Sequence, residues 1–146
     1  MVLTGGVGPE RDVSLTTGRA LAKTLEKTYS VQLEDLSSEE LPKGINGEDT
    51  IVFPAIHGTF GEDGRLQEML ENQGIIYSGS GPDASRLCMD KYESKKIVEA
   101  AGVRVAPDFG FADPLEVNNQ EILSKLGQDL IIKPVDQGSS VALYVI

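Results

Sequence analysis

The chain has 146 residues, a net charge of −10 at neutral pH, and 40% apolar against 25% charged residues. This length allows one ordinary domain or two small ones, and the composition is typical of a folded globular protein. The acidic balance argues against nonspecific nucleic-acid binding, which requires a positive surface. No apolar run reaches the ~20 residues that span a bilayer, and no secretory signal opens the chain, so we expect no membrane partner.

The number of cysteines indicates the cellular compartment, and the distribution of charge indicates where an anion site could lie. The single cysteine, Cys88, cannot form a disulfide framework, which favours the cytoplasm, and we expect its thiol to be buried and structural. Most of the negative charge lies in residues 1–88, so a phosphate site is expected in residues 89–146, where a few lysines can act locally.

The first part of the chain predicts alternating strands and helices. A strand at residues 1–4 leads through a glycine-rich loop into a helix over 13–27, for which Asp12 is the expected N-cap. A short strand is expected at residues 29–33. The acidic, turn-rich residues 34–49 are expected to form surface.

The apolar run at residues 50–56 indicates a strand covered on both faces, as in a parallel sheet. An amphipathic helix then ends at Gly74, a strand occupies residues 75–77, and Pro82 begins a further helix. This alternation predicts an α/β domain with a parallel sheet over residues 1–88. Its strand-end loops should gather at one edge of the sheet, where ligands bind in such folds.

The pattern changes near residue 90, where helices followed by a hairpin replace the strand–helix alternation and indicate an α+β region over residues 89–146. Its expected elements are helices over 91–101 and 118–126, a strand over 103–111, and a hairpin of strands at 130–134 and 141–146.

Glu10 stands in a loop opened by Gly5 and Gly6, and such glycines let backbone approach a ligand closely. A dinucleotide fingerprint is excluded, because Arg11 occupies the place of its third glycine. A carboxylate in this loop suits an ammonium group better than a phosphate. The alternative is that Glu10 and Asp12 only interact favourably with the dipole of the following helix.

His57 is the only histidine of the chain and follows an apolar strand. Its neighbour Gly58 and the nearby Gly61 indicate that a ligand or another backbone segment comes close. The alternative is a histidine that makes only structural hydrogen bonds. Metal binding is not expected, because no second histidine or cysteine accompanies it.

Two lysines are candidates for binding phosphate. Lys91 begins a predicted helix, where a cation is unfavourable unless an anion binds too, whereas Lys95 and Lys96 are expected on a solvated helix face. Lys133 ends an apolar strand and precedes the turn Gly138-Ser139-Ser140, whose N–H groups and hydroxyls could bind an anion. The alternative for Lys133 is a plain hairpin with an exposed lysine.

Together these segments resemble the D-alanine–D-alanine ligase family of the ATP-grasp superfamily. The matching segments, in order, are Gly5-Gly6 with Glu10-Arg11-Asp12-Val13-Ser14-Leu15, Ala55-Ile56-His57-Gly58 with Gly61-Glu62-Asp63-Gly64, Tyr77-Ser78-Gly79-Ser80-Gly81, Met89-Asp90-Lys91, and Lys133-Pro134 with Gly138-Ser139-Ser140-Val141. The resemblance implies a pre-ATP-grasp domain over residues 1–88 and the beginning of an ATP-grasp domain over residues 89–146.

The resemblance implies an ATP-dependent, Mg²⁺-requiring ligation of two D-alanine molecules through an acyl phosphate, for peptidoglycan synthesis. Glu10 would bind the ammonium of the first D-alanine, and His57 would shape its pocket. Lys91 and Lys133 would hold ATP phosphates, and the loop from Gly138 to Ser140 would close over them. Ser139, with Glu10, would act in catalysis by orienting a substrate-side hydrogen-bond network.

The chain departs from the family pattern at Gly8, where a small polar residue is usual, and at Ala142, where glycine is common. It stops at Ile146, before the Mg²⁺ ligands and catalytic arginine of the family, so no metal ligand is assigned and the chain alone is expected to lack ligase activity. The alternatives are a D-alanine–D-lactate or D-serine ligase, and a non-catalytic binding module or folded fragment. Unpaired strand edges predict a homodimer.

Overall fold

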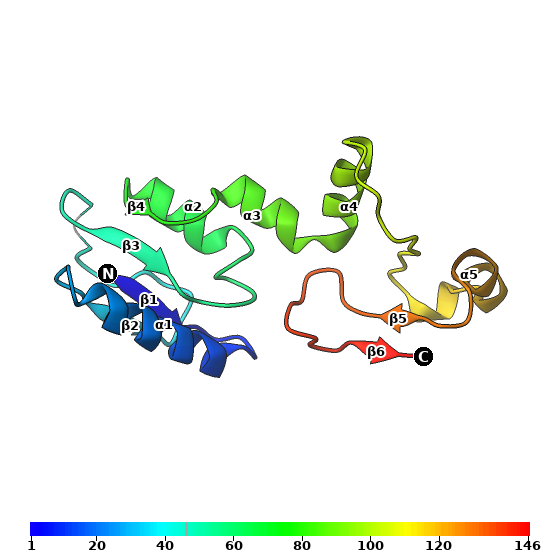
Figure 1. Ribbon diagram of the computed structural model, residues 1–146, viewed down its shortest axis with the longest axis horizontal. Coiled ribbons are helices and arrows are strands. Elements are labelled where there is room, and N and C mark those ends of the chain that lie inside the picture. Colours follow the sequence, from blue (N-terminus) through cyan, green and yellow to red (C-terminus); the bar gives the residue numbers. More distant parts are fainter. Residues whose placement is uncertain (46) are drawn as a thin grey trace. The chain divides into compact units, whose positions relative to one another are not determined.

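The computed structural model describes residues 1–45 and 47–146. The chain divides into two compact units, Met1–Met89 and Asp90–Ile146 (Figure 1), and each is described by itself. No helix among the described residues is long and apolar enough to cross a membrane.

The first unit is built on a four-stranded, fully parallel sheet in the order β2-β1-β3-β4. Its elements are β1 (Val2–Gly5), α1 (Arg11–Leu25), β2 (Leu33–Leu36), β3 (Ile51–Pro54), α2 (Arg65–Asn72), β4 (Ile76–Tyr77) and α3 (Pro82–Met89). Val2 of β1 lies opposite Leu33 on one side and Phe53 on the other. The predicted α/β class with a parallel sheet is confirmed.

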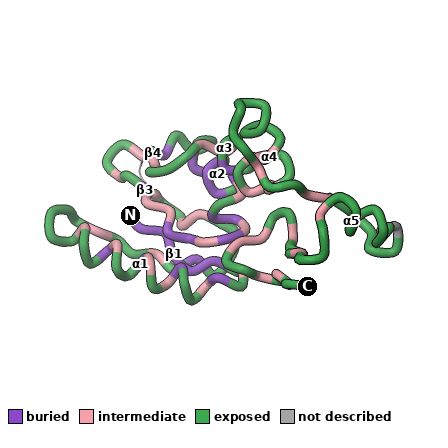
Figure 2. The backbone as a smooth tube through the Cα atoms, turned by 45° about the vertical axis from the view of Figure 1, so that its right-hand side comes forward, coloured by how far each residue is buried: buried purple, intermediate pink, exposed green. Residues whose placement is uncertain are grey.

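Helices cover both faces of this sheet, because successive residues of the central strand point to opposite sides. Leu3 packs in a buried cluster with Leu66 and Leu70 of α2, and Val2 packs in a second cluster with Ala22 of α1. Figure 1 shows α1 and α2 on opposite sides of the strands. Buried residues of β1, of these helices and at Val52 of β3 contribute to the core of the unit (Figure 2).

Helix α1 begins two residues earlier than predicted, and Asp12 is not its N-cap. The N-cap position is Glu10, whose side chain makes no capping bond. Its carbonyl instead accepts from the backbone N–H of Ser14 at 3.0 Å and from the Ser14 hydroxyl at 3.1 Å. Asp12 lies in the first turn, where its charge still favours the helix dipole.

The second strand was predicted at residues 29–33, and this placement is wrong, because the strand only begins at Leu33. The N–H groups of Thr28 and Tyr29 bond to the carbonyl of Leu25 at 3.0 and 2.9 Å, so this segment completes the end of α1. Pairing with β1 then begins at Leu33 and runs to Leu36, inside the segment expected to be surface.

The prediction of Cys88 as a buried thiol is also wrong, since Cys88 is exposed near the end of α3.

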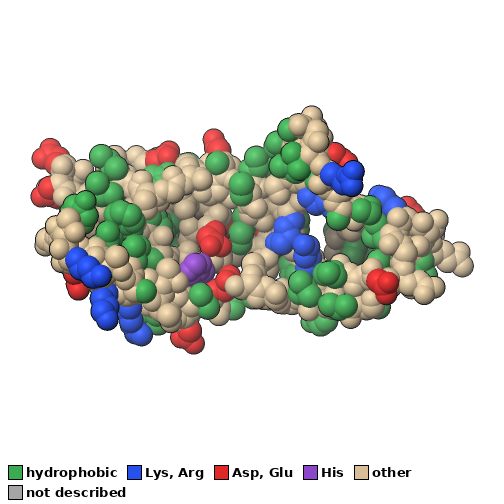
Figure 3. Space-filling view, in the orientation of Figure 1, with side chains coloured by type: hydrophobic (Ala, Val, Ile, Leu, Met, Phe, Trp, Pro, Cys, Tyr) green, Lys and Arg blue, Asp and Glu red, His purple; other side chains and the backbone are tan. Residues whose placement is uncertain are grey.

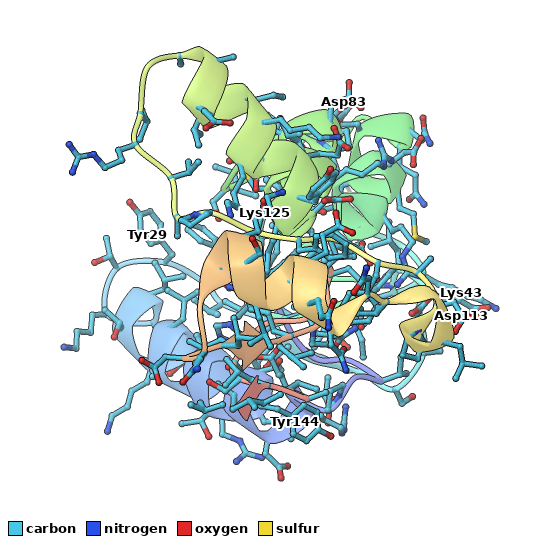
Figure 4. The ribbon with its side chains drawn as sticks, turned by 90° about the vertical axis from the view of Figure 1, so that its right-hand side faces the viewer. Tyr29, Lys43, Asp83, Asp113, Lys125 and Tyr144 are labelled. Atoms are coloured by element: carbon cyan, nitrogen blue, oxygen red, sulfur yellow. The ribbon has the colours of Figure 1, made fainter. Side chains whose placement is uncertain are left out.

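The second unit contains α4 (Lys91–Ala100), the 3₁₀ turn η1 (Pro114–Glu116), α5 (Asn119–Leu126), β5 (Ile131–Ile132) and β6 (Tyr144–Val145). The predicted hairpin is confirmed as an antiparallel pair in which Ile132 lies opposite Tyr144, although both strands are shorter than expected. No residue of this unit whose side chain the structure describes is buried (Figure 2). Tyr144 is 63% exposed, as is typical of the labelled surface side chains in Figure 4.

The predicted strand over residues 103–111 does not form. This segment pairs with no strand among the described residues, and a strand requires a partner for its N–H and C=O groups. Lys95 holds it against α4 instead, through the Ala106 carbonyl and the Asp108 carboxylate, both at 2.6 Å. Lys95 is therefore not the freely solvated residue that the pattern predicted.

Candidate ligand-binding site

The connection from β1 to α1 holds Glu10 at the carboxyl edge of the sheet. Gly5 and Gly6 turn the chain with φ of 82° and 88°, a left-handed conformation that favours glycine. The Arg11 guanidinium fixes this turn by donating to the carbonyls of Gly6 and Leu36, both at 3.0 Å. It also pairs with Asp35 at 2.8 Å, so the loop is tied to the end of β2.

Glu10 is only 7% exposed. Within residues 1–45 and 47–146, its carboxylate makes no hydrogen bond or ion pair. Gly58, with φ of 76°, passes so near that a Cβ built on it would lie 2.6 Å from Glu10 Oε2. Neither carboxylate oxygen of Glu10 is among the fully buried unpaired atoms, so the group remains accessible, and a bound cation could pair with it.

His57 links α1 to the loop after β3. Its backbone N–H donates to the Ser14 hydroxyl at 2.9 Å, and its Nε2 lies 3.0 Å from the Thr17 hydroxyl. Its Nδ1 lies 3.4 Å from Glu62 Oε1, and the other Glu62 oxygen accepts from the N–H of Gly58 at 3.0 Å. The histidine that the sequence singled out therefore has a hydrogen-bond partner at Nε2 and a carboxylate near Nδ1, one residue from the glycine that lies beside Glu10.

The loop over residues 58–64 is held by hydrogen bonds within it. Phe60 is 1% exposed and adopts a left-handed φ of 73°, and its N–H donates to Asp63 Oδ2 at 2.8 Å. Burial by itself would raise the pKa of Asp63. The backbone hydrogen bonds from Phe60 and Arg65, together with the Arg65 guanidinium, outweigh burial and lower that pKa. The charged carboxylate thereby holds the loop closed.

A cavity of about 350 Å³ lies at the carboxyl ends of β3 and β4 and is lined by His57 and Glu62, with Thr17 from α1. Gln67, 7% exposed, also lines it, and its amide nitrogen donates to Gly61 while its Oε1 is buried without a partner among the described residues. A larger cavity of about 560 Å³ lies at the opposite strand ends, near Met1. It contains none of the predicted residues, whereas the smaller cavity is lined by His57, and Glu10 lies outside that lining in the neighbouring loop. Because parallel sheets bind ligands at the carboxyl edge, we take the smaller cavity and the Glu10 loop beside it as the candidate site.

In the second unit, Lys91 contacts the segment that leads into the predicted phosphate turn. Its Nζ donates to the carbonyl of Gln137 at 2.5 Å and to that of Val135 at 3.2 Å. The N-cap Asp90 accepts from the N–H groups of Tyr92 and Glu93, both at 2.9 Å, which offsets a cation at this helix start. Lys91 therefore needs no anion to be satisfied, and its phosphate role stays a prediction.

Lys133 is exposed and makes no hydrogen bond or ion pair with any residue that the structure describes. In the turn after it, Ser139 and Ser140 have φ of 49° and 60°, and the Gly138 carbonyl accepts from Val141 at 3.0 Å. Two successive residues with positive φ make a tight turn closed by this hydrogen bond, and the anion-binding role of the turn stays a prediction. Basic side chains gather on the visible face of this unit (Figure 3).

A metal site is a separate question from the phosphate site. No group of three or more histidine, cysteine, aspartate or glutamate side chains that could hold an ion occurs in the part of the chain that the structure describes. No residue here is therefore assigned to Mg²⁺.

Sequence reasoning missed Thr17 and Gln67 as part of the site, and named Ser14 and Glu62 only as residues of the matching segments. Ser14 and Thr17 lie three residues apart on α1, so they share the helix face toward His57. That spacing was a usable signal, but only the fold shows that His57, about forty residues later, meets them.

Comparison with known proteins gives one consistent result. The family model described as "D-ala D-ala ligase N-terminus" matches residues 31–80. A D-alanine--D-alanine ligase of Clostridium botulinum is 38% identical over 99% of this chain, and one of Desulforudis audaxviator is 37% identical over the same share. Each alignment covers 48% of the relative, so the chain spans about half the length of the curated relatives it matches.

Solved structures agree. A D-alanine--D-alanine ligase of Bacillus anthracis superimposes with a TM-score of 0.79 at 35% identity, and its complex with ATP with a TM-score of 0.80 at 36% identity. Both cover 99% of this chain, and 48% and 47% of theirs. The D-alanyl-alanine synthetase A of Vibrio cholerae gives a TM-score of 0.83 at 27% identity, over 99% of this chain and 50% of that one.

The match runs through the parallel α/β unit, with its polar site at the carboxyl edge, and continues through the second unit. The chain corresponds to the N-terminal portion of the D-alanine–D-alanine ligase family, in sequence and in fold.

Proposed function

We propose that this chain supplies the first D-alanine site, and part of the ATP site, of a D-alanine–D-alanine ligase. The observation that carries the proposal is the Glu10 carboxylate, which is 7% exposed, lies against Gly58, and has no partner among the described residues. The ammonium of an amino acid would supply both the charge and the hydrogen bonds that this carboxylate lacks.

In the proposed reaction, a carboxylate oxygen of the first D-alanine attacks the γ-phosphorus of ATP and displaces ADP, giving an acyl phosphate. The free amine of a second D-alanine then attacks the acyl carbon, loses a proton and expels inorganic phosphate, leaving the dipeptide. Glu10 and the segment around His57 position the first substrate. Positioning and charge stabilisation are what phosphoryl transfer requires of a protein.

On the phosphate side, Lys133 and the turn Gly138-Ser139-Ser140 are the groups that fit an anion, with Lys91 behind the turn. In this proposal Ser139 also orients the hydrogen bonds around the substrate. Mg²⁺, when bound, neutralises charge on the transferring phosphate, and we assign it no ligand in this chain. We place the activity in the cytoplasm, in peptidoglycan synthesis, and expect a homodimer.

The test is a titration of the purified chain with D-alanine, in which two-dimensional amide NMR detects binding. Glu10→Gln keeps the shape of the side chain and removes its charge, so D-alanine affinity should fall about tenfold or more, as expected for a hydrogen bond to a charged group. Glu40→Gln is the matched control, because Glu40 is exposed and makes no hydrogen bond or ion pair with the residues that the structure describes. Equal D-alanine affinity in the wild type and Glu10→Gln would refute the assignment of Glu10.

A further inference from the structure

We infer that Glu62 is a positioning residue that holds His57 as the Nδ1–H tautomer. It thereby fixes the backbone of His57 and Gly58, which lies beside Glu10. The tautomer follows from the described contacts alone. Its consequence for D-alanine rests on the proposed function.

The Glu62 carboxylate holds two successive residues with its two oxygens. Oε2 accepts from the backbone N–H of Gly58 at 3.0 Å, and Oε1 lies 3.4 Å from His57 Nδ1. An ionised carboxylate has no proton to donate. A neutral His57 therefore makes a favourable contact there only when Nδ1 carries its proton.

The opposite ring nitrogen has a partner that suits the same tautomer. Thr17 Oγ1 lies 3.0 Å from His57 Nε2, and a hydroxyl can donate to an unprotonated nitrogen. Threonines in helices often bond back to the carbonyl four residues earlier, as Thr16 and Thr24 do here, each at 2.9 Å. Thr17 makes its recorded bond to the imidazole instead. A hydroxyl at Nε2 and a carboxylate near Nδ1 favour a positioning role for His57.

Two sets of contacts, one through Ser14 and one through Gly58, connect His57 and Glu62 to Glu10. The N–H of His57 donates to the Ser14 hydroxyl, which in turn donates to the Glu10 carbonyl at 3.1 Å. Gly58, which Glu62 holds, is the residue that leaves room for the Glu10 carboxylate. The Glu62 side chain is 48% exposed, so it contributes more to geometry than to stability.

The tautomer can be measured directly, because His57 is the only histidine and its ring signals need no assignment. Long-range ¹H–¹⁵N NMR at about pH 8.5, above the ordinary histidine pKa of about 6.5, reports which nitrogen is protonated. We expect Nδ1–H in the wild type and in Thr17→Val. In Glu62→Gln the amide oxygen still accepts from Gly58 while its NH₂ faces Nδ1, so the tautomer should reverse to Nε2–H. A wild-type Nε2–H tautomer, or no change in Glu62→Gln, would overturn the assignment.

The effect on ligand binding is measured by D-alanine titration of the same variants. Glu62→Gln should weaken D-alanine binding about tenfold, whereas Glu40→Gln should change neither the affinity nor the tautomer. Glu10→Gln should lose affinity with its tautomer unchanged. If the wild type binds no D-alanine, the proposed function fails while the tautomer result still decides the role of Glu62 toward His57. A reversed tautomer with full D-alanine affinity would refute the positioning role.

Discussion

At the scale of single residues, the site depends on a close approach between Glu10 and Gly58. The glycine has a left-handed φ of 76°, and any Cβ there would lie 2.6 Å from the Glu10 carboxylate. Two demands therefore meet at this position: a conformation that favours glycine, and space for a carboxylate from another segment. Neither demand alone would mark Gly58 as part of a binding site.

Gly58→Ala should therefore destabilise the protein and weaken D-alanine binding together. We expect a loss of about 1–3 kcal/mol in the free energy of unfolding, from backbone strain and displacement of Glu10, measured by urea denaturation. Gly74→Ala is the matched control, since Gly74 has φ of 67° but nothing within 4 Å of its Cβ position. That variant should share the strain and keep the D-alanine affinity. Equal D-alanine affinities in the two variants would contradict the role of Gly58.

Lys133 is the corresponding residue for ATP. Because its ammonium makes no recorded contact, Lys133→Gln should not disturb the hairpin, and ATP affinity should fall about tenfold. Arg104→Gln removes the same charge from an exposed arginine of the same unit, which makes no hydrogen bond or ion pair with the described part of the chain, and should leave ATP affinity unchanged. Calorimetric titration with ATP compares the two variants, and an equal loss in both would indicate a general charge effect instead of a site.

The sequence could predict Glu10, His57 and Lys133 as candidates because each stands at a strand end or beside glycines. It could not predict the partners of His57, because Thr17 lies 40 residues away and meets the ring only after α1 packs on the sheet. Nor could it show that Lys91 is satisfied by backbone carbonyls of residues 135 and 137. Long-range contacts of this kind depend on topology, which local patterns do not contain.

At the scale of elements, the parallel strands were predictable and their ends were not. A nearly continuous apolar run marked β3, because a strand covered on both faces has little polar alternation. The predicted start of β2 was too early, because the N–H groups of residues 28 and 29 bond back to α1. Strand propensity does not account for these hydrogen bonds. The segment over 103–111 has suitable residues for a strand but no strand partner among the described residues.

The contact between α2 and β4 gives a prediction at this scale. The Tyr77 hydroxyl donates to Glu71 at 2.8 Å, and partial burial, with that hydrogen bond and the negative charge of Glu71, raises the pKa of Tyr77 to about 12. A pKa raised on folding stabilises the protein fully below the unfolded value of about 10, and this stabilisation is lost as pH rises through about 12. Spectrophotometric titration should show a phenolate component near pH 12 in the wild type that is absent from Tyr77→Phe. Glu71→Gln should move this component to lower pH, and an unmoved midpoint would contradict the pairing.

At the scale of the whole molecule, the two units differ in how they are held together. The first has two buried clusters on either side of a parallel sheet, including Leu3, Leu66 and Leu70 at 0% exposure. The second has no buried residue among those whose side chains the structure describes, and its sheet is a hairpin of two residues per strand. Isolated two-stranded hairpins are marginally stable in water, so packing stabilises the first unit far more than the second.

Hydrogen exchange should therefore separate the units in the 146-residue chain. Amides of β1 and β3 should exchange slowest, because their opening requires loss of the buried clusters, whereas amides of β5 and β6 should exchange at nearly unprotected rates. Limited proteolysis should cut first within residues 103–146 and leave a product close to Met1–Met89, identified by intact mass. Saturating ATP should slow both processes in the second unit alone if Lys133 and its turn bind the phosphates, because a ligand that binds only the folded form stabilises it. Protection of β5 and β6 equal to that of β1 without ATP would show that the second unit is held by interactions other than those described.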